Sequence, residues 1–173
     1  MMYVRDDIMY IYIAYYRFDE SEVEEFSMDV FKGGLYPSQE RFKYPKAGQK
    51  NSKVQINIFN IIIKENITAK VNTKKENYLP RMKWTNRTNQ LFIQRLNRHQ
   101  NHLELLSVNP SDRNTKFIYE EKDKYYIDIH DNLTFIPENN FIWTSEKDGY
   151  NHIYFCLLYT SPSPRDLSTA RMP

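Results

Sequence analysis

A strand pair that recurs after fifty positions is the feature that most limits how this chain can fold. The segment 91–94 (LFIQ) recurs as 141–144 (FIWT), and the segment 101–105 (NHLEL) recurs as 151–155 (NHIYF). In both copies a strand, a polar turn and a second alternating strand keep the same order and register. A period near fifty residues is typical of the four-stranded blades of a β-propeller. The repeat therefore favours propeller blades over a sandwich or a barrel, with a chance match between short segments as the alternative.

Short segments of β-type pattern fill most of the chain, and no helical run separates them. Tyr and Phe are abundant, with 14 and 10 copies against 4 glycines, and aromatic residues suit a pleated, half-buried surface. Strands are predicted at 9–18, 54–63, 78–84, 90–96, 102–108, 115–120, 125–127, 133–136, 141–145 and 152–158. Such a chain holds about three blades, and a propeller needs about four or more to close. The predicted fold class is all-β, as part of a propeller.

One stretch departs from this pattern between the first two predicted strands. Residues 21–31 are predicted to form a short helical turn or an irregular loop, and residues 31–48 show no sustained period. Pro37 and Pro45 each favour extended geometry in the residue before them. Excursions longer than about 12 to 15 residues inside a compact domain usually carry function. We therefore expect residues 31–48 to leave a sheet and return to it as an interaction element.

Charge and cysteine content exclude several classes of protein. With 24 basic and 22 acidic side chains the net charge is +2, which gives no electrostatic reason to expect nucleic acid or an anionic membrane as partner. The single cysteine excludes an internal disulfide framework and leaves the compartment open. No apolar run approaches the roughly 20 residues of a membrane span, and residues 1–7 show no export signal. Three N-x-T sequons, at Asn66, Asn86 and Asn132, are expected to be chance matches in an Asn-rich chain.

The residues that could carry chemistry form no recognisable site. The four histidines are His99, His102, His130 and His152. They lack the ligand spacing of a metal site, so we expect neither metal nor cofactor. There is no Gly-x-Ser-x-Gly elbow and no phosphate-binding glycine loop, and Cys156 in an apolar strand is expected to be a buried hydrophobe. No catalytic residue is predicted.

Two charged motifs are expected to be structural. Acidic pairs occur at 19–20, 24–25 and 120–121, and neighbouring side chains on an extended chain point to opposite faces. The segment 81–84 (RMKW) could suggest a base-stacking platform, but the balanced charge favours a strand that packs Trp84 inward.

The C-terminal residues 157–173 contain three prolines and little to bury, which predicts a disordered tail. The string 158–168 (LYTSPSPRDLS) also resembles translated adapter read-through, so we expect residues 157–173 to be non-native.

Five motifs in order carry a resemblance to a known family. They are 15–23 (YYRFDESEV), 42–48 (FKYPKAG), 80–85 (PRMKWT), 96–101 (LNRHQN) and 143–152 (WTSEKDGYNH). Together they resemble the N-terminal propeller domain of the dipeptidyl peptidase IV family in the prolyl oligopeptidase clan, especially its bacterial members. The resemblance covers about residues 11–156, so residues 1–156 are expected to be a partial propeller domain.

The resemblance implies blades of an eight-bladed propeller that caps an α/β-hydrolase domain absent from this sequence. That domain carries the Ser, Asp and His triad of an enzyme that removes N-terminal dipeptides from peptide substrates. The enzyme prefers Pro or Ala at the second position of the dipeptide. The family's Glu-Glu pair is missing too, and Asp6-Asp7 is not its counterpart. We therefore expect this chain to be inactive alone and its parent to be a periplasmic or membrane-associated homodimer. The alternative from another class is a stand-alone propeller that binds proteins.

Two features carry over from the family to numbered residues. The excursion at 26–48 matches an arm that helps to form the dimer, with the candidate residues Phe31, Leu35, Tyr36, Tyr44 and Pro45. Tyr126 matches an aromatic at the wall of the substrate cleft, although Ile127 stands where some members have a basic residue. The alternative for Tyr126 is an ordinary strand aromatic.

Overall fold

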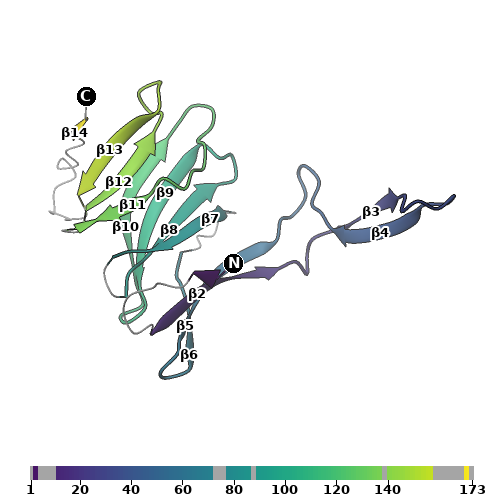
Figure 1. The fold of residues 1–173 in the computed structure, drawn as a ribbon, viewed down its shortest axis with the longest axis horizontal. Coiled ribbons are helices and arrows are strands. Elements are labelled where there is room, and N and C mark those ends of the chain that lie inside the picture. The colour runs from purple at the N-terminus through teal and green to yellow at the C-terminus, as the bar shows by residue number, and fades with distance from the viewer. Residues whose placement is uncertain are drawn as a thin grey trace.

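In a computed structural model the chain forms three four-stranded antiparallel sheets and a separate two-stranded hairpin (Figure 1). The structure describes residues 2–3, 11–71, 77–86, 89–137, 140–157 and 170–171; at 2–3 and 170–171 only the strand pairing is described. Within these residues no helix is long and apolar enough to cross a membrane. The all-β fold class predicted from the sequence is confirmed.

The first sheet has the strand order β1-β2-β5-β6. Its strands are β1 (Met2–Tyr3), β2 (Tyr12–Asp19), β5 (Lys53–Asn60) and β6 (Glu65–Thr68). Strand β2 pairs with β5 along its whole length, from Tyr12 opposite Asn60 to Asp19 opposite Lys53. The hairpin of β3 (Glu25–Val30) and β4 (Ser38–Lys43) is inserted between these two paired strands.

The other two sheets are simple meanders. The second sheet contains β7 (Asn77–Trp84), β8 (Leu91–Asn97), β9 (His102–Asn109) and β10 (Asn114–Lys122). The third contains β11 (Thr134–Ile136), β12 (Asn140–Ser145), β13 (His152–Leu157) and β14 (Ala170–Arg171). In both sheets consecutive strands are neighbours. The fifty-residue repeat maps β8 and β9 onto β12 and β13, which are the middle strands of their sheets, so the sheets are successive blades of one propeller.

The second sheet lies between the other two and buries both of its faces. In β8 the side chains of Leu91 and Ile93 join a core cluster with the first sheet, which includes Ile56 and Ile58. Phe92, one position along, joins the other cluster, with Phe141 and Trp143 of the third sheet. Side chains alternate across a strand, so a nearly continuous apolar run is needed when both faces are buried. This explains why the repeat is so apolar at residues 91–93.

Polar contacts between the second and third sheets join positions about one repeat apart. Arg81 Nε lies 2.6 Å from Asp131 Oδ1, and Lys83 Nζ donates to the Leu133 carbonyl at 2.5 Å. Asn86 Nδ2 donates to the Phe135 carbonyl at 2.9 Å. Each contact runs from β7, or just after it, to the segment that leads into or forms β11. The contacts between the two blades therefore join residues that are separated by about the same number of positions as the repeat.

Arg95 forms an ion pair within the second sheet and also bonds the chain that leaves the first. Arg95 Nε and Nη2 donate to the two carboxylate oxygens of Glu104 at 2.7 and 2.8 Å, and Arg95 Nη1 donates to the Val71 carbonyl at 2.7 Å. Both side chains are mostly buried, with 13% and 21% exposure. The bond from Arg95 lowers the pKa of Glu104 below its usual range. A bidentate pair of this kind fixes geometry as well as charge.

The structure corrects three of the segments predicted from sequence. Residues 21–31 form neither a helical turn nor only a loop, because Glu25–Val30 is strand β3 paired with β4. The predicted strand 54–63 ends at Asn60, whose side-chain oxygen accepts the amide hydrogens of Ile62 and Ile63 and closes a turn. These isoleucines are therefore exposed at a hairpin end rather than buried.

The predicted strand 125–127 is a loop. Asp123 Oδ1 accepts the amide hydrogens of Tyr125 at 2.6 Å and Tyr126 at 3.1 Å, so local turn bonds replace strand pairing. The expectation of a disordered tail at 157–173 lies outside the described residues, except for Leu157 at the end of β13 and Ala170–Arg171, which pair with β13.

The Arg95–Glu104 pair gives a stability prediction. Replacing Glu104 by Gln should lower the free energy of unfolding by about 1–2 kcal/mol, because a mostly buried guanidinium loses its charged acceptor. The effect should be full above the unfolded pKa of Glu104, near 4.5, and should shrink as pH falls through the lower folded pKa, because protonation then removes the same charge. Denaturant melts at pH 7 and pH 3 measure this change in the free energy of unfolding.

Glu120→Gln, at the exposed His102–Glu120 contact, is the control and should change stability by less than about 0.5 kcal/mol. An equal effect of both substitutions would contradict the role assigned to Glu104.

Candidate functional site

The residues singled out from the sequence lie on two separate surfaces, and the structure adds a pocket that the sequence did not indicate. The first surface is the β3–β4 hairpin, called the arm below, which comprises residues 24–46. The second is the loop 123–133 that carries Tyr126. The third is a pocket at strand β7.

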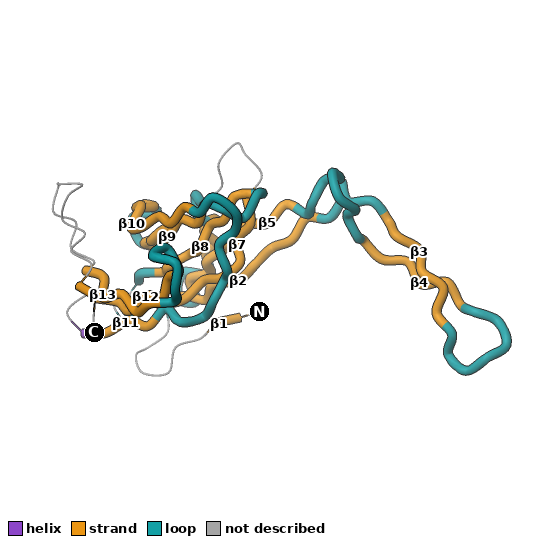
Figure 2. The backbone as a smooth tube through the Cα atoms, turned by 90° about the horizontal axis from the view of Figure 1, so that it is seen from above, coloured by secondary structure: helices purple, strands orange, loops and turns teal. Residues whose placement is uncertain are grey.

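The arm extends away from the three sheets in both views (Figures 1 and 2). Its strands pair in one register from Glu25 opposite Lys43 to Val30 opposite Ser38. Every residue of β4 is exposed. A two-stranded hairpin is marginally stable in water, so this one needs its own source of stability.

An aromatic cluster near the stem of the arm supplies part of that stability. Phe26, Phe42 and Tyr44 lie with ring centroids 5.8 to 6.1 Å apart, at tilted or edge-on angles. Lys46 Nζ lies 5.4 Å above the Phe26 ring. Aromatic pairs at these distances contribute beyond the area that they bury. The cluster also explains why residues 25–30 form a strand, since Phe26 must face Phe42 across the hairpin.

The tip of the arm presents apolar side chains to solvent. Leu35 is 94% exposed, Tyr36 is 86% exposed and Phe31 is largely exposed. Gly33 turns the loop with a φ of +82°, a region that side chains other than glycine rarely adopt. Of the five candidate arm residues, the structure places Phe31, Leu35 and Tyr36 in the tip loop. It places Tyr44 and Pro45 at the stem, apart from the tip.

Charged side chains anchor the base of the arm to the first sheet. The Glu22 carboxylate bonds Lys50 Nζ at 2.8 Å through one oxygen and Lys53 Nζ through the other. The hydrogen bonds from these lysines lower the pKa of Glu22 to about 2. Arg98 Nη2 donates to the Gln49 carbonyl at 3.0 Å, which adds a contact from the second sheet. The arm therefore leaves the blades in a direction set by its base.

Tyr126 lies on the surface of the loop that connects β10 to β11. Its side chain is exposed, as is that of Tyr125, while the next residue, Ile127, is buried in the core between the second and third sheets. The Ile127 amide donates to the Gln100 carbonyl at 2.8 Å, which ties the loop to the β8–β9 turn. Tyr126 is thus an exposed loop aromatic rather than a strand aromatic.

Three residues with potential for acid–base or nucleophilic chemistry are engaged in structural contacts. Burial raises the pKa of the Cys156 thiol to about 11, so it is a buried hydrophobe as expected. Glu121 accepts from Trp143 Nε1 at 3.2 Å and Ser145 Oγ at 2.6 Å. His130 Nε2 donates to the Thr144 carbonyl at 2.8 Å. Within the described residues no group of three or more His, Cys, Asp and Glu side chains is placed to hold a metal ion.

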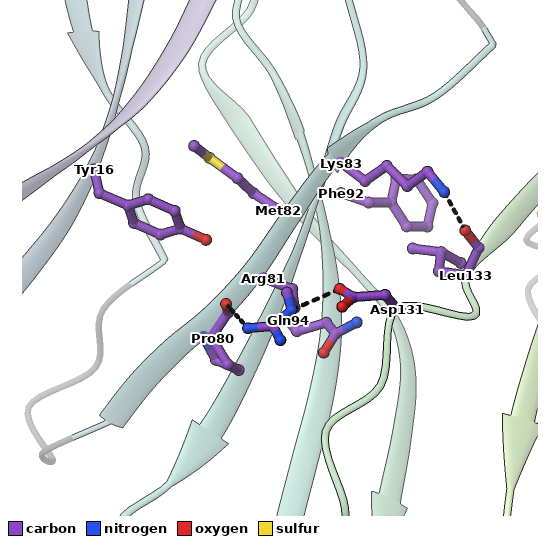
Figure 3. A pocket seen from close by; sticks show the side chains of 9 residues that line it. All are labelled: Tyr16, Pro80, Arg81, Met82, Lys83, Phe92, Gln94, Asp131 and Leu133. Carbon is purple, nitrogen blue, oxygen red and sulfur yellow. Dashed lines mark hydrogen bonds and ion pairs between the residues drawn. The ribbon is translucent and has the colours of Figure 1, made fainter. Parts of the chain in front are cut away.

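A pocket of about 530 Å³ at strand β7 is lined by residues of the first two sheets and of the segment that leads into the third (Figure 3). Tyr16 borders it from β2, Phe92 and Gln94 from β8, and Asp131 and Leu133 from the segment before β11. The β7 residues that line it include Arg81 opposite Gln94 and Lys83 opposite Phe92.

Gln94 is the unusual member of this lining. Its side chain is buried, yet Oε1 has no hydrogen-bond partner within the described part of the chain. No motif in the sequence indicated this site. The available signal was a polar Gln94 inside the apolar run of β8, one strand position after Ile93.

The chain resembles known proteins over nearly its whole length. A family model described as the dipeptidyl peptidase IV (DPP IV) N-terminal region matches residues 8–170. The probable dipeptidyl-aminopeptidase B of Phaeosphaeria nodorum is 26% identical over 179 aligned residues, which cover 88% of this chain and 20% of that protein. The probable dipeptidyl peptidase 4 of Trichophyton verrucosum is 28% identical and covers 83% of this chain and 21% of its own length.

Solved structures match in the same way. The crystal structure of Porphyromonas gingivalis dipeptidyl peptidase 4 aligns with a TM-score of 0.78 and 32% identity, covering 87% of this chain and 22% of the other. A putative dipeptidyl aminopeptidase IV from Bacteroides ovatus aligns with a TM-score of 0.74 and 27% identity, covering 85% and 21%. The chain spans about a fifth of the length of the curated relatives that it matches.

The contacts of Glu22 give a prediction about the arm. Glu22→Gln should speed amide hydrogen exchange at residues 20–24 and 47–53 by about two- to fivefold at pH 7, because the two lysines lose their shared carboxylate. The tip of the arm should exchange as before. Glu24→Gln, which changes a neighbouring acid outside these contacts, is the matched control. Unchanged exchange at the base in Glu22→Gln would show that the ion pairs do not hold the arm.

Proposed function

The chain belongs to the family of the dipeptidyl peptidase IV N-terminal region, and from that membership we propose that it forms non-catalytic blades in the eight-bladed propeller of a serine exopeptidase. The observation that carries this proposal is the family match over residues 8–170 together with three successive propeller blades. The parent enzyme would release dipeptides with Pro or Ala in second place from the amino ends of peptides. The domain boundary that we propose is residue 156, with residues 157–173 as a non-native tail.

In this proposal the chemical step falls to an α/β-hydrolase domain with a Ser, Asp and His triad, outside the sequence described here. The blades would restrict access to that triad and line part of the path to it. The structural roles of Cys156, Glu121 and His130 support a scaffold, because these side chains already serve packing or hydrogen bonding within the blades.

Tyr126 is the residue that we assign to the wall of the substrate cleft. Its exposed ring and its turn, anchored through Asp123 and Ile127, support that assignment, since a binding aromatic must reach solvent from a fixed backbone. Ile127 is buried, so a basic side chain at that position could not lie as Ile127 does. The cleft of this protein would therefore rely on the aromatic alone at this place.

The proposal is tested with a chromogenic Gly-Pro substrate. The 173-residue chain should release no chromophore above the buffer rate, whereas a complete dipeptidyl peptidase in the same assay should do so readily. Turnover that rises in proportion to the chain and that survives further purification would contradict the non-catalytic role. A parent reading frame without a downstream Gly-x-Ser-x-Gly segment would favour the alternative, a protein-binding propeller.

We also assign the arm to a contact between two copies of the protein. Its apolar tip at Phe31, Leu35 and Tyr36 supports this assignment, because single surface apolar residues are ordinary but a projecting cluster of them indicates an interface.

The arm assignment predicts a change in self-association. Leu35→Asp should weaken dimerisation of the chain at least about tenfold in sedimentation velocity, because a charge at the centre of an apolar contact must be desolvated. Ile153→Asp is the control: Ile153 is also an exposed apolar residue, but it lies on β13 in the third sheet, away from the arm. If Ile153→Asp dissociates the dimer and Leu35→Asp does not, association occurs through the blades and the arm assignment fails.

A further inference from the structure

We propose that the pocket at strand β7 binds the C-terminal residue of a short peptide: an acylated amino acid with a free carboxylate and an apolar side chain. This inference goes beyond the scaffold role proposed above and does not depend on it. It rests on three properties of the lining: an unpartnered acceptor, an excess of positive charge and an apolar wall (Figure 3).

The unpartnered acceptor is the side-chain oxygen of Gln94. The residue is only 3% exposed, and Oε1 finds no donor within the described residues. A buried carbonyl oxygen without a partner is costly, so most are paired in folded proteins. Gln94 borders the pocket, and a turn of its side-chain amide toward the pocket would let a ligand N–H group supply the missing donor. A peptide amide carries such a group.

The charge of the lining favours an anion. Arg81 and Lys83 are two cations on β7, and Asp131 is the one acid among the residues that border the pocket. Asp131 pairs with Arg81 at 2.6 Å, whereas the contact of Lys83 Nζ is with a neutral acceptor, the Leu133 carbonyl. The ammonium of Lys83 is therefore not neutralised by that bond. It lies beside the pocket as a ready partner for a carboxylate.

The apolar wall is formed by buried side chains from three strands or segments. Met82, Phe92 and Leu133 all border the pocket and are almost fully buried. Arg81 and Lys83 lie directly across from Gln94 and Phe92 in the β7–β8 pairing, so these four side chains share one face of the second sheet. Met82 lies on the other face, in the core cluster with the first sheet, and borders the pocket at the edge strand β7. A ligand for this pocket needs an N–H donor for Gln94, a carboxylate for Lys83 and an apolar side chain for the wall. The C-terminal residue of a peptide is built in this way.

N-acetyl-leucine is the probe, and two close analogues each lack one group. 4-Methylpentanoate keeps the carboxylate and the apolar chain but has no N–H donor, and N-acetyl-leucinamide keeps the donor but has no charge. Nuclear magnetic resonance titration of the 173-residue chain should show saturable binding of N-acetyl-leucine, at least about fivefold tighter than either analogue.

Two variants assign the preferences to residues. Gln94→Leu should remove the preference over 4-methylpentanoate, and Lys83→Met should remove the preference over N-acetyl-leucinamide. Gln94→Leu replaces an unpaired polar group by an apolar one of similar size, so the variant should melt at or above the wild-type temperature. Lys116→Met, on the exposed side of β10, is the control and should keep both preferences.

The outcomes separate cleanly. Loss of one preference in each variant, with a preserved melt, supports the pocket and the role of both residues. Equal binding of the three probes, no saturable binding of N-acetyl-leucine at about 10 mM, or unchanged preferences in Gln94→Leu would overturn the proposal. A chain that fails the Gly-Pro test of function can still pass this one, so the two proposals stand or fall separately.

Discussion

The fold depends on the burial of both faces of strand β8. Leu91 and Ile93 pack against the first sheet while Phe92 packs against the third, so the second sheet is stable only between two neighbours. Burying a side chain of this size is worth about 1.5–3 kcal/mol, which makes the stacked faces the largest favourable contribution in the molecule. The polar contacts act within this frame. Arg81–Asp131 joins β7 to the segment before β11. Arg95, which pairs with Glu104 within the second sheet, also bonds the Val71 carbonyl of the chain that leaves the first sheet.

This arrangement explains which parts of the structure could be predicted from the sequence. A blade has one strand pattern and one turn pattern, so the repeat between residues 91–105 and 141–155 predicted the middle strands of two sheets. The two corresponding turns both contain a residue with a positive φ, but the residue differs: it is Gln100 between β8 and β9 and Gly149 between β12 and β13. The repeat in the sequence indicates the strands whose faces are buried, and it does not depend on which residue forms the turn.

The parts that could not be predicted depend on partners that are distant or unusual. Residues 25–30 carry no strong period, and they form a strand because Phe26 meets Phe42 and Tyr44 after a loop. The run Ile61–Ile63 has high β propensity, but the Asn60 side chain competes for its amide hydrogens and wins. The pocket is lined by Gln94 of β8 and by Asp131 of the segment before β11, which are far apart in the sequence, so no local pattern encodes it. The arm was anticipated through the resemblance to a family, and the roles of its residues remain proposals.

The place where the arm leaves the first sheet has a consequence for how such a protein can vary. The chain departs after Asp19 and returns at Lys53, and these two residues face each other in the β2–β5 pairing. The sheet already holds the two ends together. The entropic cost of closing the inserted segment therefore rises only slowly with the length of that segment. The segment between these positions can be lengthened, shortened or exchanged without a change in the register of β2 and β5. The β3–β4 hairpin could therefore be replaced by another inserted segment, in evolution or by design, while the blades remain unchanged.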